Sequence, residues 1–453
     1  MIEQPSRSFL DRTHSSLEVL QSRANVTERV FTGLTSELRA QIKVGMQDYP
    51  ESFRVEVKNP PSYRATVITP NSLHESPQPK VGVVFLPGFG GRAAGTAHVI
   101  SELYQKLPDH LTDSQVSLAA SLSSSISQDL ETNSFAKSHL ERATHYAVFI
   151  TELLIQNPYP VDKLQLVAHS LSGMEASYMM PILKSLLRQN NLKTQIAGLV
   201  LAQPGGMYDQ NRLRFMFKRM PEVISFEGEI AEMFPTIFDI QRVKDELGQA
   251  QVQQDSGRVM ALKQQLLEME QKRQNPPHLI PEQKQALLQI DQALESPANS
   301  DGKMTKSLIR HRKKLLKPVI KEVLQGADIR QEENPRPLSL IQFLVANFLP
   351  GRKGIASSLP EAIIHGLDKV PVALVFGEQD GYFKLKEYQE YLNKQATKGK
   401  HPLQASARRF IAEIANWPHI APATNPAKFA NIVGDIFKRM DEPSTSQITE
   451  LQY

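Results

Sequence analysis

The sequence predicts an α/β fold, namely a mostly parallel sheet flanked by helices, with a large inserted all-helical domain. Strand-sized apolar runs alternate with helix-like segments from about residue 80 to residue 202. The alternation stops over residues 208–358, which are rich in Gln, Lys and Glu and show helical spacing only, and it resumes from residue 359. Strands that alternate with helices in this way are typical of a parallel sheet wrapped by helices.

Size and composition limit the classes of protein that fit. The chain has 453 residues, enough for two or three domains' worth of core, and 40% of them are hydrophobic. It has no cysteine, which excludes disulfides, thiol catalysis and cysteine metal sites. A net charge of +4 does not by itself argue for nucleic acid. No signal-peptide pattern and no run of about 20 apolar residues is present, so we expect a cytoplasmic protein.

The first residues of the chain are expected to lie outside the sheet. Residues 1–50 contain apolar positions at loosely helical spacing, which predicts an N-terminal helical extension. Residues 53–57 and 63–68 then alternate apolar and polar side chains across Asn59-Pro60-Pro61-Ser62. This pattern predicts a hairpin-like pair of strands.

A glycine cluster follows the first continuous apolar run. Residues 81–86 predict a buried strand, and Gly88-Phe89-Gly90-Gly91 predicts a tight loop after it. An ordinary strand-to-loop connection explains the pattern equally well. A phosphate-binding loop is disfavoured, because no Gly-Lys-Ser/Thr follows and Arg92 is the one nearby cation.

The most informative stretch is residues 163–174, where an apolar run passes through small residues into a helix-like segment. Ser170 lies between the small residues Ala168 and Ser172. A strand that turns sharply into a helix presents its central side chain on a strained bend, and only small neighbours fit beneath it. The amide of Leu171 would then face the serine oxygen. The alternatives are a Ser-rich helix N-cap and, as a weaker nucleophile, Ser172.

These motifs resemble those of the α/β-hydrolase family. The family usually has glycine at both small positions of the serine motif and histidine where Pro87 stands. The resemblance covers roughly residues 60–207 and 360–440. It implies an α/β-hydrolase core in two parts (51–207 and 359–440), a helical cap or lid over 208–358, and an oxyanion hole formed by the amides of Phe89 and Leu171.

The resemblance also implies a catalytic acid. In the family, the strand after the cap ends in Gly-x-x-Asp, and that aspartate orients the catalytic base. The apolar run 370–376 ends in Gly377-Glu378-Gln379-Asp380. Asp380 matches the family position, Glu378 is the fallback, and Asp209 is a weaker alternative.

The catalytic base is assigned by the same resemblance. The family keeps a histidine in the loop after the last strand, before a helix. Residues 408–414 predict that strand, and His419 lies in the loop between it and the helix predicted at 426–440. His169, His365 and His401 lack this context. Residues 441–453 are polar, which predicts a loose C-terminal tail.

The inserted segment predicts paired helices and a basic stretch. Apolar positions recur at three- and four-residue spacing over 259–269 and 287–294, on either side of Asn275-Pro276-Pro277, which predicts a helical hairpin. The aromatic residues of the insertion would line an apolar acyl or alkyl site, or form the insertion's own core. Residues 303–321 contain eight basic and no acidic residues. A solvated helix face is the preferred interpretation, and a weak membrane or protein contact is the alternative.

Together these features predict a serine hydrolase that cleaves a carboxylic ester or thioester through Ser170, His419 and Asp380. The order of glycine loop, serine, aspartate and histidine carries more weight than any one motif. An acyltransferase with the same triad and a catalytically silent binding protein are the alternatives. We expect a small-molecule ester or thioester substrate and no nucleic acid. We also expect no cofactor and no metal, since no pattern such as His-Glu-x-x-His occurs.

Overall fold

The structure is a computed structural model of the chain. The structure describes residues 20, 24–31, 35–48, 63–73, 77–88, 93, 96–111, 113–123, 139–205, 234–252, 256–276, 279–295, 302–325, 370–378, 380, 383, 385–396, 408–414, 417, 419, 421–442 and 448–453.

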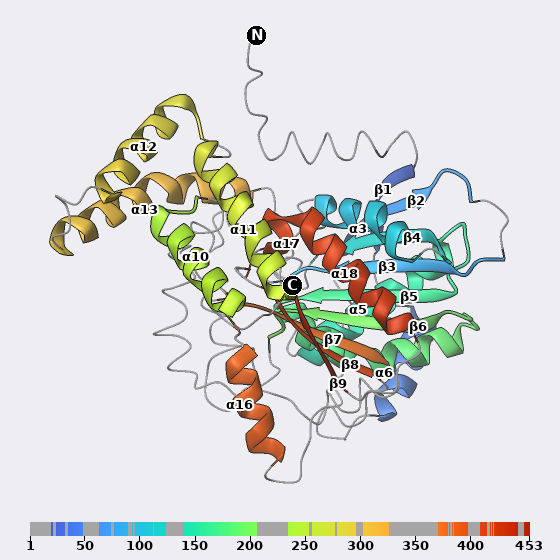
Figure 1. The fold of residues 1–453 in the computed structure, drawn as a ribbon. Coiled ribbons are helices and arrows are strands. Elements are labelled where there is room, and N and C mark those ends of the chain that lie inside the picture. The colour runs from blue at the N-terminus through green and yellow to red at the C-terminus, as the bar shows by residue number, and fades with distance from the viewer. Residues whose placement is uncertain are drawn as a thin grey trace, which may run out of the picture.

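Within the described residues, one sheet of nine strands forms the centre of the molecule (Figure 1). The strands are β1 (Ala24–Phe31), β2 (Tyr63–Pro70), β3 (Lys80–Leu86), β4 (Gln115–Leu122), β5 (Lys163–His169), β6 (Gln195–Ala202), β7 (Pro371–Gly377), β8 (Arg408–Ile414) and β9 (Ile448–Gln452). Their order in the sheet is β1-β2-β4-β3-β5-β6-β7-β8-β9. β2 is antiparallel to both of its neighbours, and all pairs from β4 to β9 are parallel.

Helices cover both faces of this sheet. They are α2 (Ser36–Gly45), the short 3-10 helix η1 (Met46–Asp48), α3 (Ala97–His110), α5 (His139–Gln156), α6 (Leu171–Gln189), α16 (Leu385–Ala396), α17 (Ala421–Thr424) and α18 (Pro426–Asp441). Alternate strand residues enter two separate cores, as the two-residue period of a strand requires. Val84 and Leu166 pack with α2, α5 and α6 on one face, and Phe85 and Val167 pack with α3 and α18 on the other. The predicted α/β architecture is therefore confirmed.

In the part of the insertion that the structure describes, four helices gather to one side of the sheet, where Figure 1 shows them in yellow-green to orange. They are α10 (Ile237–Val252), α11 (Ser256–Gln274), α12 (Pro281–Glu295) and α13 (Gly302–Gln325), and we call them the cap helices. They fall within the segment predicted to be helical. Asn275 and Pro276 lie between α11 and α12, as the predicted break requires. The aromatic residues of 206–233 and 326–369 lie outside the described residues.

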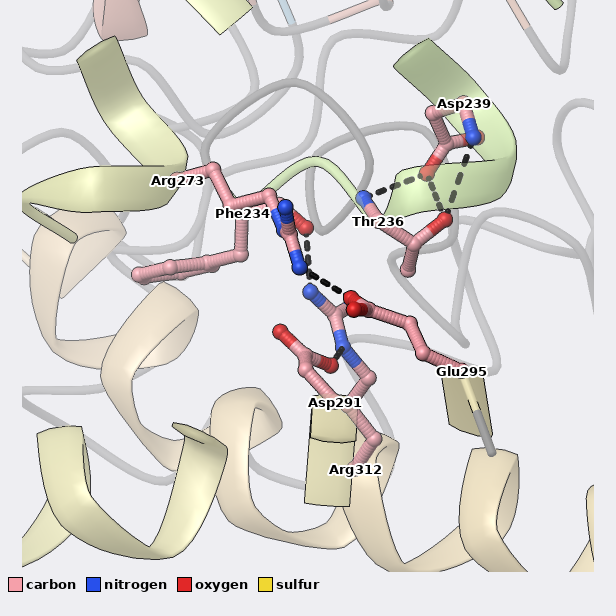
Figure 2. A network of polar contacts seen from close by, with 7 residues as sticks. All are labelled: Phe234, Thr236, Asp239, Arg273, Asp291, Glu295 and Arg312. Carbon is pink, nitrogen blue, oxygen red and sulfur yellow. Dashed lines mark hydrogen bonds and ion pairs between the residues drawn. The ribbon is translucent and has the colours of Figure 1, made fainter. Parts of the chain in front are cut away.

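A buried arginine joins three parts of the cap (Figure 2). Arg312 of α13 donates from Nε to Asp291 Oδ1 of α12 at 2.7 Å, and from Nη2 to the carbonyl oxygen of Phe234 at 2.5 Å. Arg312 and Asp291 are both buried. A buried charge is tolerated when it is paired and hydrogen-bonded, and this arginine meets both conditions.

Two neighbouring contacts complete the polar network of Figure 2. Arg273 at the end of α11 contacts Glu295 at the end of α12. Thr236, just before α10, accepts a hydrogen bond from the amide of Asp239, and the Asp239 carboxylate accepts one from the amide of Thr236 at 2.9 Å. This reciprocal pair satisfies amide groups that the first turn of a helix leaves without partners.

Two predictions about the N-terminal region need correction. The extension at 1–50 is not wholly helical, because Ala24–Phe31 forms β1 while Ser36–Gly45 forms the helix α2. Phe31, one of the apolar positions of this region, packs in the core from the end of a strand, where its ring lies 5.3 Å from that of Phe149. The predicted hairpin of residues 53–57 with 63–68 is not formed, because β2 pairs with β1 on one side and with β4 on the other; residues 53–57 lie outside the described residues.

The predicted loose tail is also wrong at its end. Residues 448–452 form β9, which pairs in parallel with β8 at the edge of the sheet. The phenol of Tyr453 donates to Asp435 Oδ2 on α18 at 2.5 Å, and the amide of Tyr453 donates to the carbonyl of Glu413. Edge pairing and a side-chain anchor therefore order a segment whose composition is polar.

Among the helices that the structure describes, none combines the length and the apolar character needed to cross a membrane.

Candidate active site

Ser170 lies at the turn between β5 and α6, near the middle of the sheet. β5 pairs with β3 on one side and with β6 on the other. The backbone of Ser170 has a φ of 54° and a ψ of −123°, a conformation that non-glycine residues rarely adopt. Its amide donates to the carbonyl of Ala202 at the end of β6 at 2.9 Å, which holds the strained turn against the neighbouring strand.

Close packing around this turn explains the glycines at positions 88 and 173. A Cβ atom on Gly88 would lie 2.8 Å from the Cβ of Ser170 and 3.1 Å from Nδ1 of His169. A Cβ atom on Gly173 would lie 2.6 Å from the Cβ of Pro204. Glycine is therefore required at both positions for the loop after β3 and the loop after β6 to approach the turn.

Ser172 has a different environment from Ser170. It is buried, and its hydroxyl donates to the carbonyl of Pro87 at 2.5 Å. The hydroxyl of Tyr146 lies 3.3 Å from Oγ of Ser172. Ser172 therefore links α6 to the loop after β3, which explains why a small polar residue fits a position where a plain glycine is usual. No base comparable to a histidine contacts it among these partners.

His419 lies between Ser170 and Asp380. Its Nε2 atom is 2.8 Å from Oγ of Ser170, and its Nδ1 atom is 3.0 Å from Oδ2 of Asp380. Because a carboxylate only accepts, Nδ1 carries the proton and Nε2 is left to accept from the serine hydroxyl. The structure thus brings together the three side chains that the sequence analysis selected from distant parts of the chain.

Asp380 is fully buried, and its position is fixed by several contacts. Its second oxygen accepts a hydrogen bond from the amide of Phe383 at 3.1 Å, and its own amide donates to the carbonyl of Gly377. The fallback Glu378 is exposed to solvent, and its amide donates to the carbonyl of Ile414. The other alternative, Asp209, lies outside the described residues.

The serine, aspartate and histidine occur in that order along the chain, each just beyond a strand of the parallel region of one sheet. The serine lies on a strained strand-to-helix turn. This combination of chain order and turn geometry distinguishes one fold from the other folds that use the same three residues. The chain has an α/β-hydrolase fold.

Comparisons with known proteins find similar solved structures at low sequence identity. The chain is similar to a peroxisomal alpha-beta-hydrolase from Saccharomyces cerevisiae, with 11% identity, 94% of this chain and 92% of the other covered, and a TM-score of 0.42. It is also similar to a proline iminopeptidase from Mycobacterium smegmatis (10% identity, 84% and 96% covered, TM-score 0.33). A thermostable esterase from Pseudomonas putida shares 9% identity, with 97% and 92% covered and a TM-score of 0.31. No family model and no curated protein matches the sequence.

In α/β-hydrolases, backbone amides beside the serine form the oxyanion hole. Leu171 is the first residue of α6, so its amide is among those that have no partner within the helix. The other expected donor, Phe89, lies outside the described residues. Beyond it, the amide of Ala93 donates to Ser123 Oγ at 3.0 Å, and the hydroxyls of Thr96 and Ser121 lie 2.6 Å apart. The end of β4 therefore holds the segment that follows the glycine loop.

His169 also contacts the site, although the sequence analysis gave it no role. Its Nε2 atom donates to the carbonyl oxygen of His419 at 2.7 Å, and the two rings are 5.0 Å apart. Burial, and then the nearby His419, lower the pKa of His169 to about 3. The one signal for this residue was its position directly before the serine. His365 and His401 lie outside the described residues.

Proposed function

We propose that the chain is a serine hydrolase that cleaves a carboxylic ester or thioester through an acyl-enzyme. One observation carries the proposal, namely the unbroken series of contacts from Ser170 Oγ to His419 at 2.8 Å and from His419 to Asp380 at 3.0 Å. A serine hydroxyl is a weak nucleophile at its own pKa and needs an adjacent base. A base that is itself oriented by a buried carboxylate meets that need.

In the first half of the reaction, Ser170 Oγ attacks the substrate carbonyl carbon while Nε2 of His419 takes the hydroxyl proton. Asp380 holds the ring in the required tautomer and stabilises the imidazolium that forms. The carbonyl oxygen becomes an oxyanion. The backbone amide of Leu171, the residue directly after Ser170, would donate a hydrogen bond to it. One such donor is typically worth about 10²–10³ in rate.

The tetrahedral intermediate then collapses. The bond to the leaving alkoxide or thiolate breaks, and the leaving group takes the proton from His419, which leaves an acyl-Ser170 ester. Water attacks this ester with His419 again as the base, and the carboxylic acid and the free serine are released. We further propose that the cap helices shelter an apolar acyl or alkyl group, since a lid over an ester site excludes water from the reaction.

Two other functions remain as alternatives. An acyltransferase would use the same triad, with an alcohol or amine in place of water, and product analysis with candidate acceptors distinguishes it from a hydrolase. A catalytically silent binding protein is less well supported, because three side chains from distant parts of the chain lie within hydrogen-bond distance in a productive order.

The decisive experiment is labelling with a fluorophosphonate probe, followed by intact-mass measurement. The wild type should gain one adduct, and Ser170→Ala should gain none. Ser172→Ala is the matched control, since it removes a buried hydroxyl two residues away, and it should still be labelled. A folded wild type that stays unlabelled, with and without detergent, would exclude an activated serine. Labelled protein then goes to a panel of esters and thioesters of different chain lengths.

A further inference from the structure

The helix α13 presents two different faces. Arg312, Leu316 and Val319 are buried, and Arg312 points toward Asp291 of α12 (Figure 2). Lys306, Arg310 and Lys314 are exposed. The internal ion pair therefore fixes the rotation of α13, and Lys306, Arg310 and Lys314 face solvent.

The three exposed cations form one line along the helix, which we call the basic face. They are spaced four residues apart, so they occupy the same side of α13 and span about 12 Å at 1.5 Å per residue. No acidic residue occurs anywhere in 303–321. Like charges four residues apart destabilise a helix unless something else holds them, and the buried Arg312 provides such an anchor.

Exposed aliphatic side chains accompany the basic face. Met304 and Ile309 of α13 are 51% and 41% exposed. Among the residues that the structure describes, eight of the eleven large hydrophobic side chains left exposed lie in 234–325, the region of the cap helices. The full set is Phe238, Val252, Met260, Leu267, Ile280, Leu288, Met304 and Ile309. They are distributed over the four cap helices and the residue before α12, and Met304 and Ile309 are the two that share a helix with the basic face.

We propose that the basic face of α13 docks the cap onto an anionic lipid membrane. Lys and Arg attract the anionic headgroups, and exposed aliphatic side chains enter the boundary between headgroups and acyl chains. A nucleic acid would pair with the cations but would leave the exposed aliphatic side chains without apolar contacts, and α13 has no Phe, Tyr or Trp on which bases could stack. The membrane proposal does not depend on the reaction proposed for Ser170.

The test is sedimentation of the full-length protein with vesicles of phosphatidylcholine alone and with 30% phosphatidylglycerol. We expect binding to the anionic vesicles only, weakened by salt. Lys306→Gln, Arg310→Gln and Lys314→Gln together should lower the partition coefficient about 100-fold. The matched control neutralises the exposed Lys43, Lys193 and Lys438, which lie on other elements, and should bind like the wild type.

Three results would overturn the membrane proposal. The first is a wild type that ignores anionic vesicles, and the second is an equal loss of binding in the control variant, which would mean that total charge alone decides. The third is tighter binding to a DNA or RNA oligonucleotide than to the vesicles at the same salt concentration. A further variant, Met304→Ser with Ile309→Ser, should weaken binding while leaving the net charge unchanged.

A separate observation concerns the main chain of the catalytic base. The ring of His169 donates to the carbonyl oxygen of His419, and the side chain of Gln203 bonds the same ring. The backbone amide of Gln203 donates a hydrogen bond to the carbonyl of Val375. Gln203 itself has a φ of 48°. The loop that carries His419 is thereby tied to residues at the ends of β5 and β6.

We infer that His169 is a positioning residue that keeps the His419 ring facing Ser170. The inference rests on the proposed function. His169 is linked to both members of the reacting pair. It precedes Ser170 directly in the chain, and its ring donates a hydrogen bond to the main-chain carbonyl of His419. A neutral His169 also adds no positive charge beside the imidazolium that forms during reaction.

The test compares two substitutions of similar length. His169→Gln keeps an N–H donor near the position of Nε2, and His169→Met does not. The fluorophosphonate labelling rate of His169→Met should fall about 10- to 100-fold, since a small displacement of a reacting group has an effect of this size. His169→Gln should stay within about threefold of the wild type. On an ester substrate, the loss should fall on kcat and leave KM nearly unchanged.

The outcomes separate this inference from the proposed function. If the wild type is not labelled, the serine hydrolase proposal fails. If the wild type is labelled and both variants react at its rate, or if both are impaired equally, the positioning role alone is overturned. The unfolding transitions of both variants in urea show whether a slow rate reflects a folded protein.

Discussion

Asp380 and His419 are joined by a 3.0 Å contact between Oδ2 and Nδ1, and the aspartate is completely shielded from solvent. The amide of Phe383 binds the other carboxylate oxygen, so the group has little freedom to turn. Such a carboxylate can fix the tautomer of the ring and stabilise its charged form. The exposed Glu378, two residues earlier, has neither the burial nor this contact.

Asp380→Asn should therefore lower kcat by about 10⁴, because an amide in this place favours the wrong tautomer of His419 while keeping the shape of the site. Glu378→Gln, the control, should leave kcat within about twofold. Steady-state kinetics on an ester substrate measures both. Equal effects of the two substitutions would show that Asp380 does not orient the base.

Gln165 is a polar residue in the central strand β5 that has no exposed surface. Among the described residues, neither polar atom of its side chain has a hydrogen-bond partner. Leaving such a group unsatisfied costs about 1–3 kcal/mol. Gln165→Met retains the length of the side chain and should raise the free energy of unfolding by about 1–2 kcal/mol in urea denaturation. The same substitution at the exposed Gln195 should change little, and a destabilised Gln165→Met would show that the amide is bonded.

The sequence was sufficient to predict the parallel core and the three residues of the candidate triad. Ser170, Asp380 and His419 each follow an apolar run that is recognisable without tertiary information. Ends of parallel strands meet at one edge of a sheet, so residues far apart in the sequence could be expected to converge. The glycine loop was recognisable in the same way, although Phe89 lies outside the described residues.

Other features could not be predicted because distant contacts decide them. β1 and β9 have mixed polar sequences, and their strand state comes from pairing with β2 and β8. The contact between His169 and the carbonyl of His419 joins residues 250 positions apart and involves the main chain, which leaves no pattern in the sequence. The buried Arg312 likewise resembled the solvated cations around it until its partner on α12 was known.

Arg312 and Asp291 should contribute strongly to the stability of the cap. Removing one partner of a buried pair leaves an uncompensated charge and costs about 3–5 kcal/mol. Asp291→Asn or Arg312→Met should therefore speed hydrogen exchange in α12 and α13, with little change in β5. The control is the pair between the exposed Arg242 and the half-buried Glu246 of α10, and removing Glu246 should cost less than about 1 kcal/mol. Uniform exchange changes across the chain would contradict a local role for this pair.

His169 should make the protein less stable in acid. Its pKa is lowered to about 3 in the folded state, mainly by burial, whereas an unfolded histidine has a pKa of about 6.5. Between these values the unfolded chain binds more protons, so stability rises with pH and falls on acidification. At pH 5 the loss from this group relative to pH 7 is about 2 kcal/mol.

Urea denaturation at pH 5, pH 7 and pH 9 measures this contribution. In His169→Gln, the loss of stability from pH 7 to pH 5 should be about 2 kcal/mol smaller than in the wild type, because the variant has no imidazole to protonate on unfolding. From pH 7 to pH 9 the two proteins should change in parallel, since the group is neutral in both states there. An identical acid loss in both proteins would mean that His169 does not resist protonation in the folded state.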